Sequence, residues 1–370
     1  MRRGIFAKVA VLAAAIALLA AACGRDEPKQ AEPGGGGKQQ EEAQSVLDQV
    51  IERGTLRCGV NETVPGFGFL TAEGQIEGFD IDFCKGIASA VLGDPEAHEL
   101  VPISADERFN ALRAGQYDVL VRNTTWTSSR DGAEGVAFTH VNFYDSQAMM
   151  VRADSGFESL EDMNNTAICV TSGTTTELNL ADVFGDLGLE FESISFEENP
   201  QIQEAFIQDR CQGWTADRSQ AAGIRSAWPE DQGGPEALVI LDDVMSKEPL
   251  TPAVLDGDPK WQDAVSWTIK GIILAEELGV DSGNVEQQAQ NPDNPQIGNL
   301  LGAPTEEGAP FDPGLGLAPD FMVNVIRDVG NYGEIYDRHV GPNSPLGLER
   351  GLNALWSDDP PGLHYAPPYR

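Results

Sequence analysis

The stretch that decides the fold is DVLVRNTTWTSSR, residues 118–130. The run from Tyr117 to Val121 is short, apolar and rich in β-branched residues, which predicts a buried strand. Thr and Ser residues that can cap a helix follow it, and Arg130 stands just past them. Strand, polar turn and helix start together predict a shelf at the carboxyl end of a sheet, where open α/β folds bind their ligands.

The side chains of this shelf favour a binding site for an anion. The guanidinium of Arg130 can hold a carboxylate with two parallel hydrogen bonds. Hydroxyl and backbone groups of residues 123–127 can donate to, or accept from, the rest of a ligand. The alternative is a surface arginine that follows a core strand, and the rest of the chain argues against that alternative.

Residues 1–22 have the organisation of a signal peptide. A basic start is followed by an apolar run over residues 9–19 and by small residues over 20–22. Cys23 directly follows the small residues, which resembles a bacterial lipoprotein signal, where this thiol is diacylated after cleavage. An ordinary secretory signal and an uncleaved anchor are the alternatives, although the apolar run is short for a membrane span.

Residues 23–44 are charged and Gly-rich, without a large apolar side chain. Such a segment cannot bury a core, so we expect a flexible tether. Lipid, tether and folded body together predict an extracytoplasmic protein that is lipid-anchored to the cell membrane, in a periplasm or on the outer face of the cytoplasmic membrane.

The composition excludes several classes of partner. The formal net charge of −35 argues against nucleic acid and anionic membrane surfaces. The 4 histidines are scattered and lack the spacing of a zinc site. Phosphate-loop, dinucleotide and nucleophile-elbow motifs do not appear in the sequence. We therefore expect no metal and no cofactor. Separately from these observations, we expect a monomer that is not an enzyme.

The cysteines predict disulfides. If Cys23 carries lipid, Cys58, Cys84, Cys169 and Cys211 remain of the 5 in the chain. Outside the reducing cytosol they suggest two disulfides, for which three connectivities are possible. Pairing neighbours, Cys58 with Cys84 and Cys169 with Cys211, closes one loop in each half of the molecule. Free buried thiols are the alternative.

A family resemblance begins at GFDIDF, residues 78–83. Phe79, Phe83, Ile87 and Val91 recur every four residues after it, which predicts a helix with one buried stripe. The run resembles the signature of extracytoplasmic solute-binding proteins for polar amino acids. Other segments resemble the general L-amino-acid-binding subgroup of ABC importers, and the resemblance extends over nearly all of residues 56–370. These segments are residues 56–60, 108–118, 123–127, 330–334, 341–345 and 354–356.

The resemblance implies a two-lobed α/β protein with the type II periplasmic-binding-protein fold and two crossover strands as its hinge. Residues 45–146 and 250–370 would form lobe 1, and residues 147–249 lobe 2. Strands and helices alternate through lobe 2, which independently favours a parallel α/β arrangement. We expect residues 279–319, rich in Gly, Pro and Asn, to be a loop insertion with short turns. Further helices should follow it near the C-terminus.

The implied function is the capture of free L-amino acids by hinge closure and their delivery to an ABC transporter permease. Asp217 follows a predicted strand, and on its own it is better explained as the N-cap of the helix that starts at Arg218; the resemblance reverses that preference. In the family, the aligned acid binds the α-amino group of the ligand. The Asn123 carbonyl and the Thr125 hydroxyl are further candidates for that ammonium.

We assign the ligand carboxylate to Arg130, with help from Thr125 and from the backbone amides of Thr174 and Thr175. These amides open a helix, where the N-terminus attracts anions. The candidates that shape the side-chain pocket are Arg122, Phe67 and Trp126. An arginine there would suit acidic or amide side chains, and a role in a salt-bridged wall is the alternative.

Two rival functions remain open. An enzyme on the same fold, similar to cyclohexadienyl dehydratase, would need a general acid over a bound ring, and the sequence suggests none. A ligand-sensing module that reports to a receptor would have the same site as a transport protein, so the sequence does not separate the two.

Overall fold

The computed structural model describes residues 44–304 and 308–370. The predicted signal peptide, the tether to Ala43 and lipidation at Cys23 lie outside the described residues. Across the part of the chain that is described, no helix is both long and apolar enough to cross a membrane.

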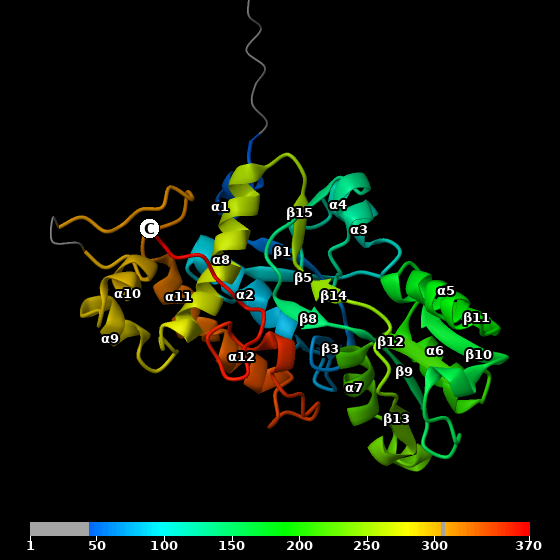
Figure 1. Cartoon of the computed structure of the whole chain (residues 1–370). Helices are drawn as coiled ribbons and strands as arrows, with labels where there is room; N and C mark the ends of the chain where they lie inside the picture. Colours follow the sequence, from blue (N-terminus) through cyan, green and yellow to red (C-terminus); the bar gives the residue numbers. More distant parts are fainter. Residues whose placement is uncertain (1–43, 305–307) are drawn as a thin grey trace, which may run out of the picture. The chain divides into compact units, whose positions relative to one another are not determined.

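A mixed five-stranded sheet, the first sheet, has the order β5-β1-β6-β15-β7. Figure 1 labels three of its strands, β1, β5 and β15. β1 is parallel to β5 and to β6, whereas β15 is antiparallel to β6 and to β7. Four of the five residues of β1 are buried, since the strand lies between β5 and β6 and α2 packs against it. Its strands are β1 (Leu56–Val60), β5 (His98–Pro102), β6 (Val119–Leu120), β7 (Val136–Phe138) and β15 (Ala253–Leu255).

A second five-stranded sheet has the order β11-β10-β12-β9-β13. The predicted parallel arrangement holds for β10 with β11 and β12, but β9 is antiparallel to both β12 and β13. Its strands are β9 (Gln147–Arg152), β10 (Thr166–Thr171), β11 (Phe191–Phe196), β12 (Gly213–Asp217) and β13 (Leu238–Ile240). Its connecting helices are α5 (Thr175–Leu187), α6 (Asn199–Ile207) and α7 (Arg218–Ser226).

Two crossing strands connect the sheets. β8 (Phe143–Asp145) leads the chain from the first sheet toward the second, and β14 (Glu248–Leu250) leads it back. They pair antiparallel, with Asp145 opposite Glu248. All strands of the second sheet lie between these two in sequence, so the second sheet is an insertion into the chain of the first.

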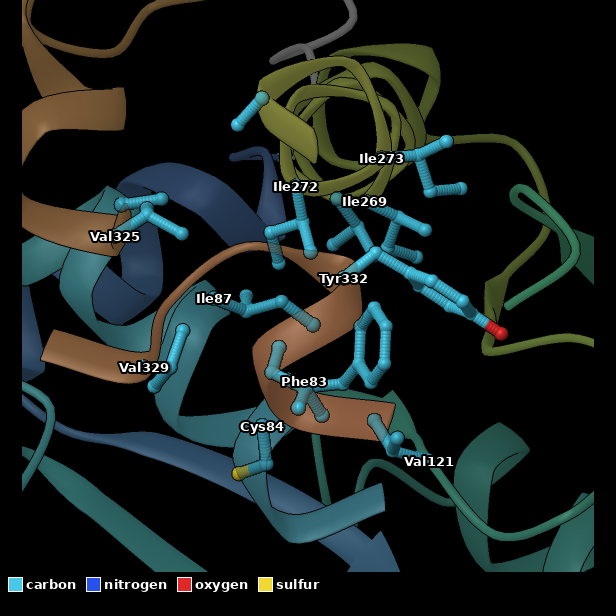
Figure 2. Close-up of a cluster of buried hydrophobic side chains, with 14 of the residues drawn as sticks. Phe83, Cys84, Ile87, Val121, Ile269, Ile272, Ile273, Val325, Val329 and Tyr332 are labelled. Atoms are coloured by element: carbon cyan, nitrogen blue, oxygen red, sulfur yellow. The ribbon is translucent and has the colours of Figure 1, made fainter. Parts of the chain in front are cut away.

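Four helices form the core next to the first sheet (Figure 2). Phe83 and Ile87 of α2 pack with Ile272 of α8, Val329 of α11 and Tyr332 of α12. The predicted single buried stripe of α2 is too narrow a description, because this helix contacts β1, α8, α11 and α12 at once. The helices are α2 (Phe79–Leu92), α8 (Pro259–Glu277), α11 (Phe321–Val329) and α12 (Tyr332–His339).

The remaining elements are short. A three-stranded sheet lies beside α2, and two short helices occupy the predicted loop insertion, where Asn294 caps the second of them through the amides of Gln296 and Ile297. The short elements are α1 (Val46–Arg53), β2 (Thr63–Val64), β3 (Gly68–Leu70), β4 (Ile76–Glu77), α3 (Arg108–Arg113), α4 (Ser128–Ala133), α9 (Val285–Gln290), α10 (Pro295–Leu300), and the 3-10 turns η1 (Leu160–Met163), η2 (Glu230–Gln232), η3 (Pro235–Ala237) and η4 (Gly351–Asn353).

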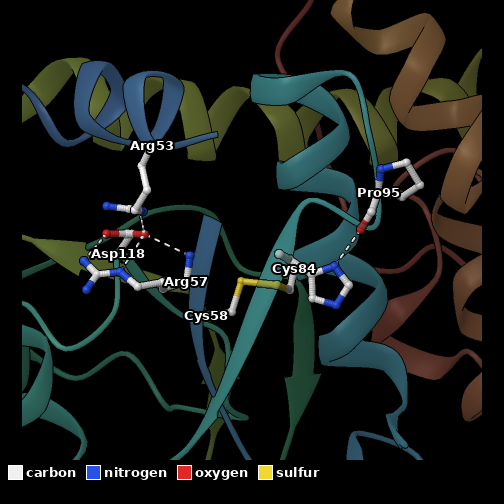
Figure 3. The surroundings of a disulfide bond; sticks show 7 residues. Arg53, Arg57, Cys58, Cys84, Pro95 and Asp118 are labelled. Atoms are coloured by element: carbon white, nitrogen blue, oxygen red, sulfur yellow. Dashed lines mark hydrogen bonds and ion pairs between the residues drawn. A yellow bond between two sulfur atoms is a disulfide. The ribbon is translucent and has the colours of Figure 1, made fainter. Parts of the chain in front are cut away.

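The disulfides confirm the pairing of neighbours. Cys58 of β1 is bonded to Cys84 of α2 (Figure 3), and Cys169 of β10 is bonded to Cys211 just before β12. Each bond therefore ties a sheet to an adjacent segment of its own half.

Next to the first disulfide, the buried carboxylate of Asp118 fixes the start of the shelf (Figure 3). Arg57 Nη2 donates to Asp118 Oδ1 at 2.7 Å, and Arg53 also pairs with this carboxylate. The backbone N–H of Arg57 donates to Asp118 Oδ2 at 2.8 Å, which links β1 to the residue that precedes β6.

Candidate functional site

A pocket lies between loops of the first sheet and loops of the second. The end of the shelf lines one side of the pocket, and the start of α5 and the end of β12 line the other. This is the position at which open α/β sheets bind ligands. Seven of the predicted ligand-binding residues line it: Arg122, Asn123, Thr125, Arg130, Thr174, Thr175 and Asp217.

Three arginines form the basic side of the pocket: Arg108, Arg122 and Arg130. Burial lowers the pKa of each guanidinium, and for Arg108 and Arg130 the neighbouring arginines add to the effect. Among the described residues, none of the three is in a salt bridge. Two buried guanidinium groups, those of Arg108 and Arg122, and the half-buried one of Arg130 therefore suit this side of the pocket to an anion.

Backbone carbonyls hold these arginines in place. Arg122 Nε donates to the Ile103 carbonyl at 2.8 Å, and Arg130 Nη1 donates to the Thr125 carbonyl at 2.9 Å. Arg130 also lies in α4, which begins where the Thr127 hydroxyl accepts from the Arg130 amide at 3.3 Å. The predicted capping of this helix by the Thr and Ser run is confirmed.

Asn123 is the sharp corner of the shelf. Its φ of 24° lies in the left-handed region that non-glycine residues seldom adopt, and such residues concentrate at functional sites. Asp80 Oδ2, in the first turn of α2, accepts from the Asn123 amide at 2.8 Å and so supports the corner. Burial raises the pKa of Asp80 to about 7, although the hydrogen bond from Asn123 and the positive charge of Arg122 each lower it.

Thr174 and Thr175 begin α5 on the opposite side. The Thr174 hydroxyl accepts from the Glu177 amide at 3.2 Å, so Thr174 is the N-cap of the helix predicted here. The Thr175 Oγ1 lies 3.3 Å from the Thr125 Oγ1, so residues 50 positions apart in sequence meet in the pocket.

Asp217 ends β12 and faces the pocket as a buried carboxylate. It is the N-cap residue of α7, yet in the described chain its side chain makes no capping hydrogen bond. Burial raises its pKa well above the usual value, and the nearby carboxylates of Asp145 and Glu248 raise it further. Because a buried carboxylate is stabilised by a cation, this position suits a ligand ammonium better than it suits a helix cap.

Phe67 and Trp126 were predicted to shape the side-chain pocket, and the structure places both elsewhere. Phe67 is 1% exposed and packs in the core, with its ring 5.1 Å from that of Phe143. Trp126 is 40% exposed and stacks on Phe138 at 5.9 Å. Apolar packing partners hold each ring away from the polar lining.

Polar residues that the sequence did not single out complete the lining. Arg108 opens α3, and its Nη2 donates to the Gly173 carbonyl across the pocket at 3.2 Å. Glu198 precedes α6, and burial raises its pKa while Arg122 opposes the rise. Gln220 of α7 accepts from Asn123 Nδ2 at 3.4 Å. Arg108 begins one of the segments that resemble the family, which is the signal that could have identified it.

Two sheets joined by a pair of crossing strands, with a pocket of opposite charges between their loops, define a two-lobed binding protein. Residues 56–279 match the bacterial extracellular solute-binding proteins, family 3, and the chain belongs to that family.

Several known proteins resemble the chain over most of its length. The general L-amino acid-binding periplasmic protein AapJ of Rhizobium johnstonii is 45% identical over 88% of this chain and 93% of its own. The glutamate/glutamine/aspartate/asparagine-binding protein BztA of Rhodobacter capsulatus is 41% identical over 88% and 94%.

A solved structure has the same fold. An ABC transporter periplasmic binding protein from Brucella ovis with glutathione bound superposes with a TM-score of 0.83, at 41% identity over 88% of this chain and 100% of that one. The predicted type II periplasmic-binding-protein fold is confirmed.

Proposed function

We propose that this protein is an extracytoplasmic solute-binding protein that captures free L-amino acids and delivers them to the permease of an ABC importer. The names of the Rhizobium and Rhodobacter relatives support the ligand class. Membership of family 3 supports an extracytoplasmic location and a transport role.

One observation carries this proposal: one pocket holds three arginines that form no salt bridge with any described residue on one side and the buried carboxylate of Asp217 on the other. A zwitterion fits such a pocket in one orientation. We assign its carboxylate to Arg130 and to the amides of Thr174 and Thr175 at the start of α5. We assign its ammonium to Asp217, with the Asn123 carbonyl and the Thr125 hydroxyl as further acceptors.

The charges of the pocket also suggest which side chains it prefers. An amino acid pairs with Arg130 through its carboxylate and with Asp217 through its ammonium. The charged residues of the lining that remain are then two cations, Arg108 and Arg122, and one carboxylate, Glu198. The remaining positive charge favours a side chain with a carboxylate or an amide. The four amino acids in the name of the Rhodobacter relative have such side chains.

Glutathione is a second candidate ligand, because the Brucella protein was solved with it bound. Its γ-glutamyl residue has a free α-carboxylate and a free α-ammonium, and its glycine adds another carboxylate. The same pocket therefore offers a partner to each of its charges.

We further propose that the two sheets belong to two lobes, residues 45–146 with 250–370 and residues 147–249, that close over the ligand. The crossing strands β8 and β14, which run side by side between the sheets, support a hinge there. Lipidation at Cys23 would keep the protein at the membrane near its permease, where it acts as a monomer.

Isothermal titration calorimetry of the twenty L-amino acids and glutathione tests the proposal. We expect micromolar or tighter binding for at least one acidic or amide amino acid, and no binding of its carboxyl-amidated or N-acetylated form. A protein that binds none of these compounds would contradict the proposal.

Mass spectrometry of the ligand after incubation separates a binding protein from an enzyme. We expect the ligand to be recovered unchanged, and a new product would favour the enzyme. Ligand-dependent stimulation of the ATPase of a co-reconstituted permease would favour transport over a receptor role.

A further inference from the structure

Glu248 is a buried carboxylate that the proposed contacts with the ligand do not use. It is 1% exposed and stands on the crossing strand β14, directly behind two of the threonines that line the pocket. Its Oε2 accepts from the Thr125 hydroxyl at 2.5 Å and from the Thr175 hydroxyl at 2.8 Å. Its Oε1 accepts from Asn179 Nδ2 at 2.9 Å and from the Ser246 hydroxyl.

These four donors fill the hydrogen-bonding capacity of one carboxylate. Each carboxylate oxygen has two lone pairs, and each oxygen of Glu248 has two donors. The arrangement fits the ionised form, because a protonated carboxyl would need an acceptor among groups that are already donating. Glu248 therefore determines where the hydroxyl protons of its partners point.

A hydroxyl has one proton, and the protons of Thr125 and Thr175 both point at Glu248. Toward the pocket each hydroxyl can then present only lone pairs. The 3.3 Å separation of the two Oγ1 atoms fits this orientation, since neither oxygen has a second proton for the other. Such oxygens can accept from an ammonium but cannot donate to a carboxylate.

We propose that Glu248 is a positioning residue that fixes Thr125 and Thr175 as acceptors and thereby selects ligands with an α-ammonium. This inference rests on the proposed function, and it narrows one of its assignments. Thr125 serves the ammonium alone, and the carboxylate is left to Arg130 and the backbone amides.

The same carboxylate joins three parts of the fold. Thr125 follows β6 of the first sheet, Thr175 and Asn179 belong to α5 beside the second sheet, and Glu248 itself lies in the crossing strand. The acceptor orientation is consequently set only when both sides of the pocket are together.

The test is Glu248→Gln, which keeps the shape but replaces one oxygen by an NH₂ group. At the Oε2 position this group must donate, so Thr125 or Thr175 has to accept from it and to turn its own proton into the pocket. At the Oε1 position it would instead face the donors Asn179 Nδ2 and Ser246. We expect the dissociation constant of the bound L-amino acid to rise about tenfold, which is the size of one charge-assisted hydrogen bond. The control is Glu276→Gln, which removes a half-buried carboxylate paired with Arg350 outside the pocket and should leave affinity within about twofold.

A double-mutant cycle with Thr125→Val tests whether Glu248 acts through the hydroxyl. We expect the double variant to bind no more than about twofold more weakly than Thr125→Val alone, because the group that Glu248 orients is already absent. Additive losses in the cycle would overturn the inference. So would an unchanged affinity of Glu248→Gln, or a loss beyond about a hundredfold, which one reoriented hydroxyl does not explain.

A second ligand distinguishes positioning from general damage to the site. The L-2-hydroxy acid matched to the best amino acid has a hydroxyl that can either donate or accept, so it adapts to a reoriented threonine. We expect Glu248→Gln to lower the preference for the amino acid over the hydroxy acid in competition titrations. Equal losses for both compounds would overturn the inference, whereas a wild-type protein that binds no amino acid would overturn the proposed function itself.

Discussion

The two sides of the pocket hold their charges by different means. On the basic side, Arg122 and Arg130 donate to backbone carbonyls of the same side, so their guanidinium groups are fixed before any ligand arrives. On the acidic side, Asp217 is buried near Asp145 and Glu248, and its pKa is raised well above the usual value. The basic side is pre-organised for an anion, whereas the acidic side is destabilised until a cation arrives.

This difference determines the orientation in which a zwitterion binds, and it allows the bound ligand to favour closure of the two sides of the pocket. A zwitterion satisfies both sides only when they face each other across it. Its differential affinity for the closed arrangement is what can drive a hinge. The predictions below test the two sides separately, from the largest expected effect to the smallest.

Arg130→Ala removes the cation of the basic side to which we assign the ligand carboxylate, and it should abolish amino-acid binding with the fold intact. The ligand carboxylate would then be buried without its partner, at a cost of about 3–5 kcal/mol by analogy with broken buried pairs. Arg130→Lys should not rescue binding, because an ammonium cannot reproduce the two parallel hydrogen bonds. Calorimetry checks both variants, with Arg113→Ala, a change at an exposed ion pair, as the control. Unchanged affinity in either Arg130 variant would remove Arg130 from the site.

Removing a disulfide tests whether ligand affinity depends on the two sides of the pocket alone or also on the stability of the fold. Replacing Cys58 and Cys84 by Ser, or Cys169 and Cys211 by Ser, should lower the free energy of unfolding by about 2–4 kcal/mol, chiefly by releasing the unfolded chain. The affinity and its dependence on ligand charge should stay unchanged, because neither bond touches the pocket lining. Urea unfolding measures the first effect and calorimetry the second. Non-reducing peptide mapping that found a crossed pair or free thiols would contradict the assignment.

Asp217→Asn removes the charge of the acidic side and keeps its shape. We expect a loss of about 1.5–3 kcal/mol in binding, the value of a hydrogen bond to a charged group. Closure should weaken as well, so the ligand-induced decrease in radius of gyration measured by X-ray scattering should be smaller than in the wild type. If the variant binds and closes normally, the ammonium contact belongs to another residue.

The pH dependence of binding should come from the acidic side. A bound ammonium stabilises the Asp217 carboxylate and lowers its pKa from the raised value of the free protein. Below that raised value free Asp217 is protonated, so binding must release a proton, and affinity should fall as the pH falls. One proton corresponds to at most about 1.4 kcal/mol per pH unit.

Calorimetry in two buffers of different ionisation enthalpy counts the released proton. Asp217→Asn is the control, since Asp145, whose pKa burial raises to about 6, also titrates nearby. A proton release that persists in this variant would assign it to Asp145 or to another group.

Local chemistry made much of the fold and part of the site predictable. The strand and turn around Asp118 and the capped starts of α4 and α5 follow from side-chain patterns within a few residues. The four cysteines that remain after Cys23 predicted two disulfides, but their number did not decide among the three connectivities. Arg130 and Asp217 could be nominated because each follows a strand at a carboxyl edge. The capping alternative for Asp217 could be discarded only once its side chain was placed.

Contacts between distant segments could not be predicted in this way. Glu248 lies 123 positions from Thr125 and 73 from Thr175, and an acid in a short extended run indicates nothing about either partner. The prediction that Phe67 shapes the side-chain pocket was wrong for the same reason. The sequence does not distinguish a loop phenylalanine that lines a site from one that packs against a distant residue such as Phe143.

The crossing strands also fix the order in which the molecule can be completed during synthesis. The second sheet uses only residues 147–240, so all of its strands exist once that segment has left the ribosome. The first sheet is incomplete until β15 (Ala253–Leu255) is synthesised, because this strand pairs between β6 and β7. The first sheet therefore contains the first strand to be synthesised, β1, and also the last one, β15. Until residue 255 emerges, β6 and β7 lack the partner that pairs between them, while every strand of the second sheet is already present. Such unpaired strand edges are where a growing chain is open to mispairing.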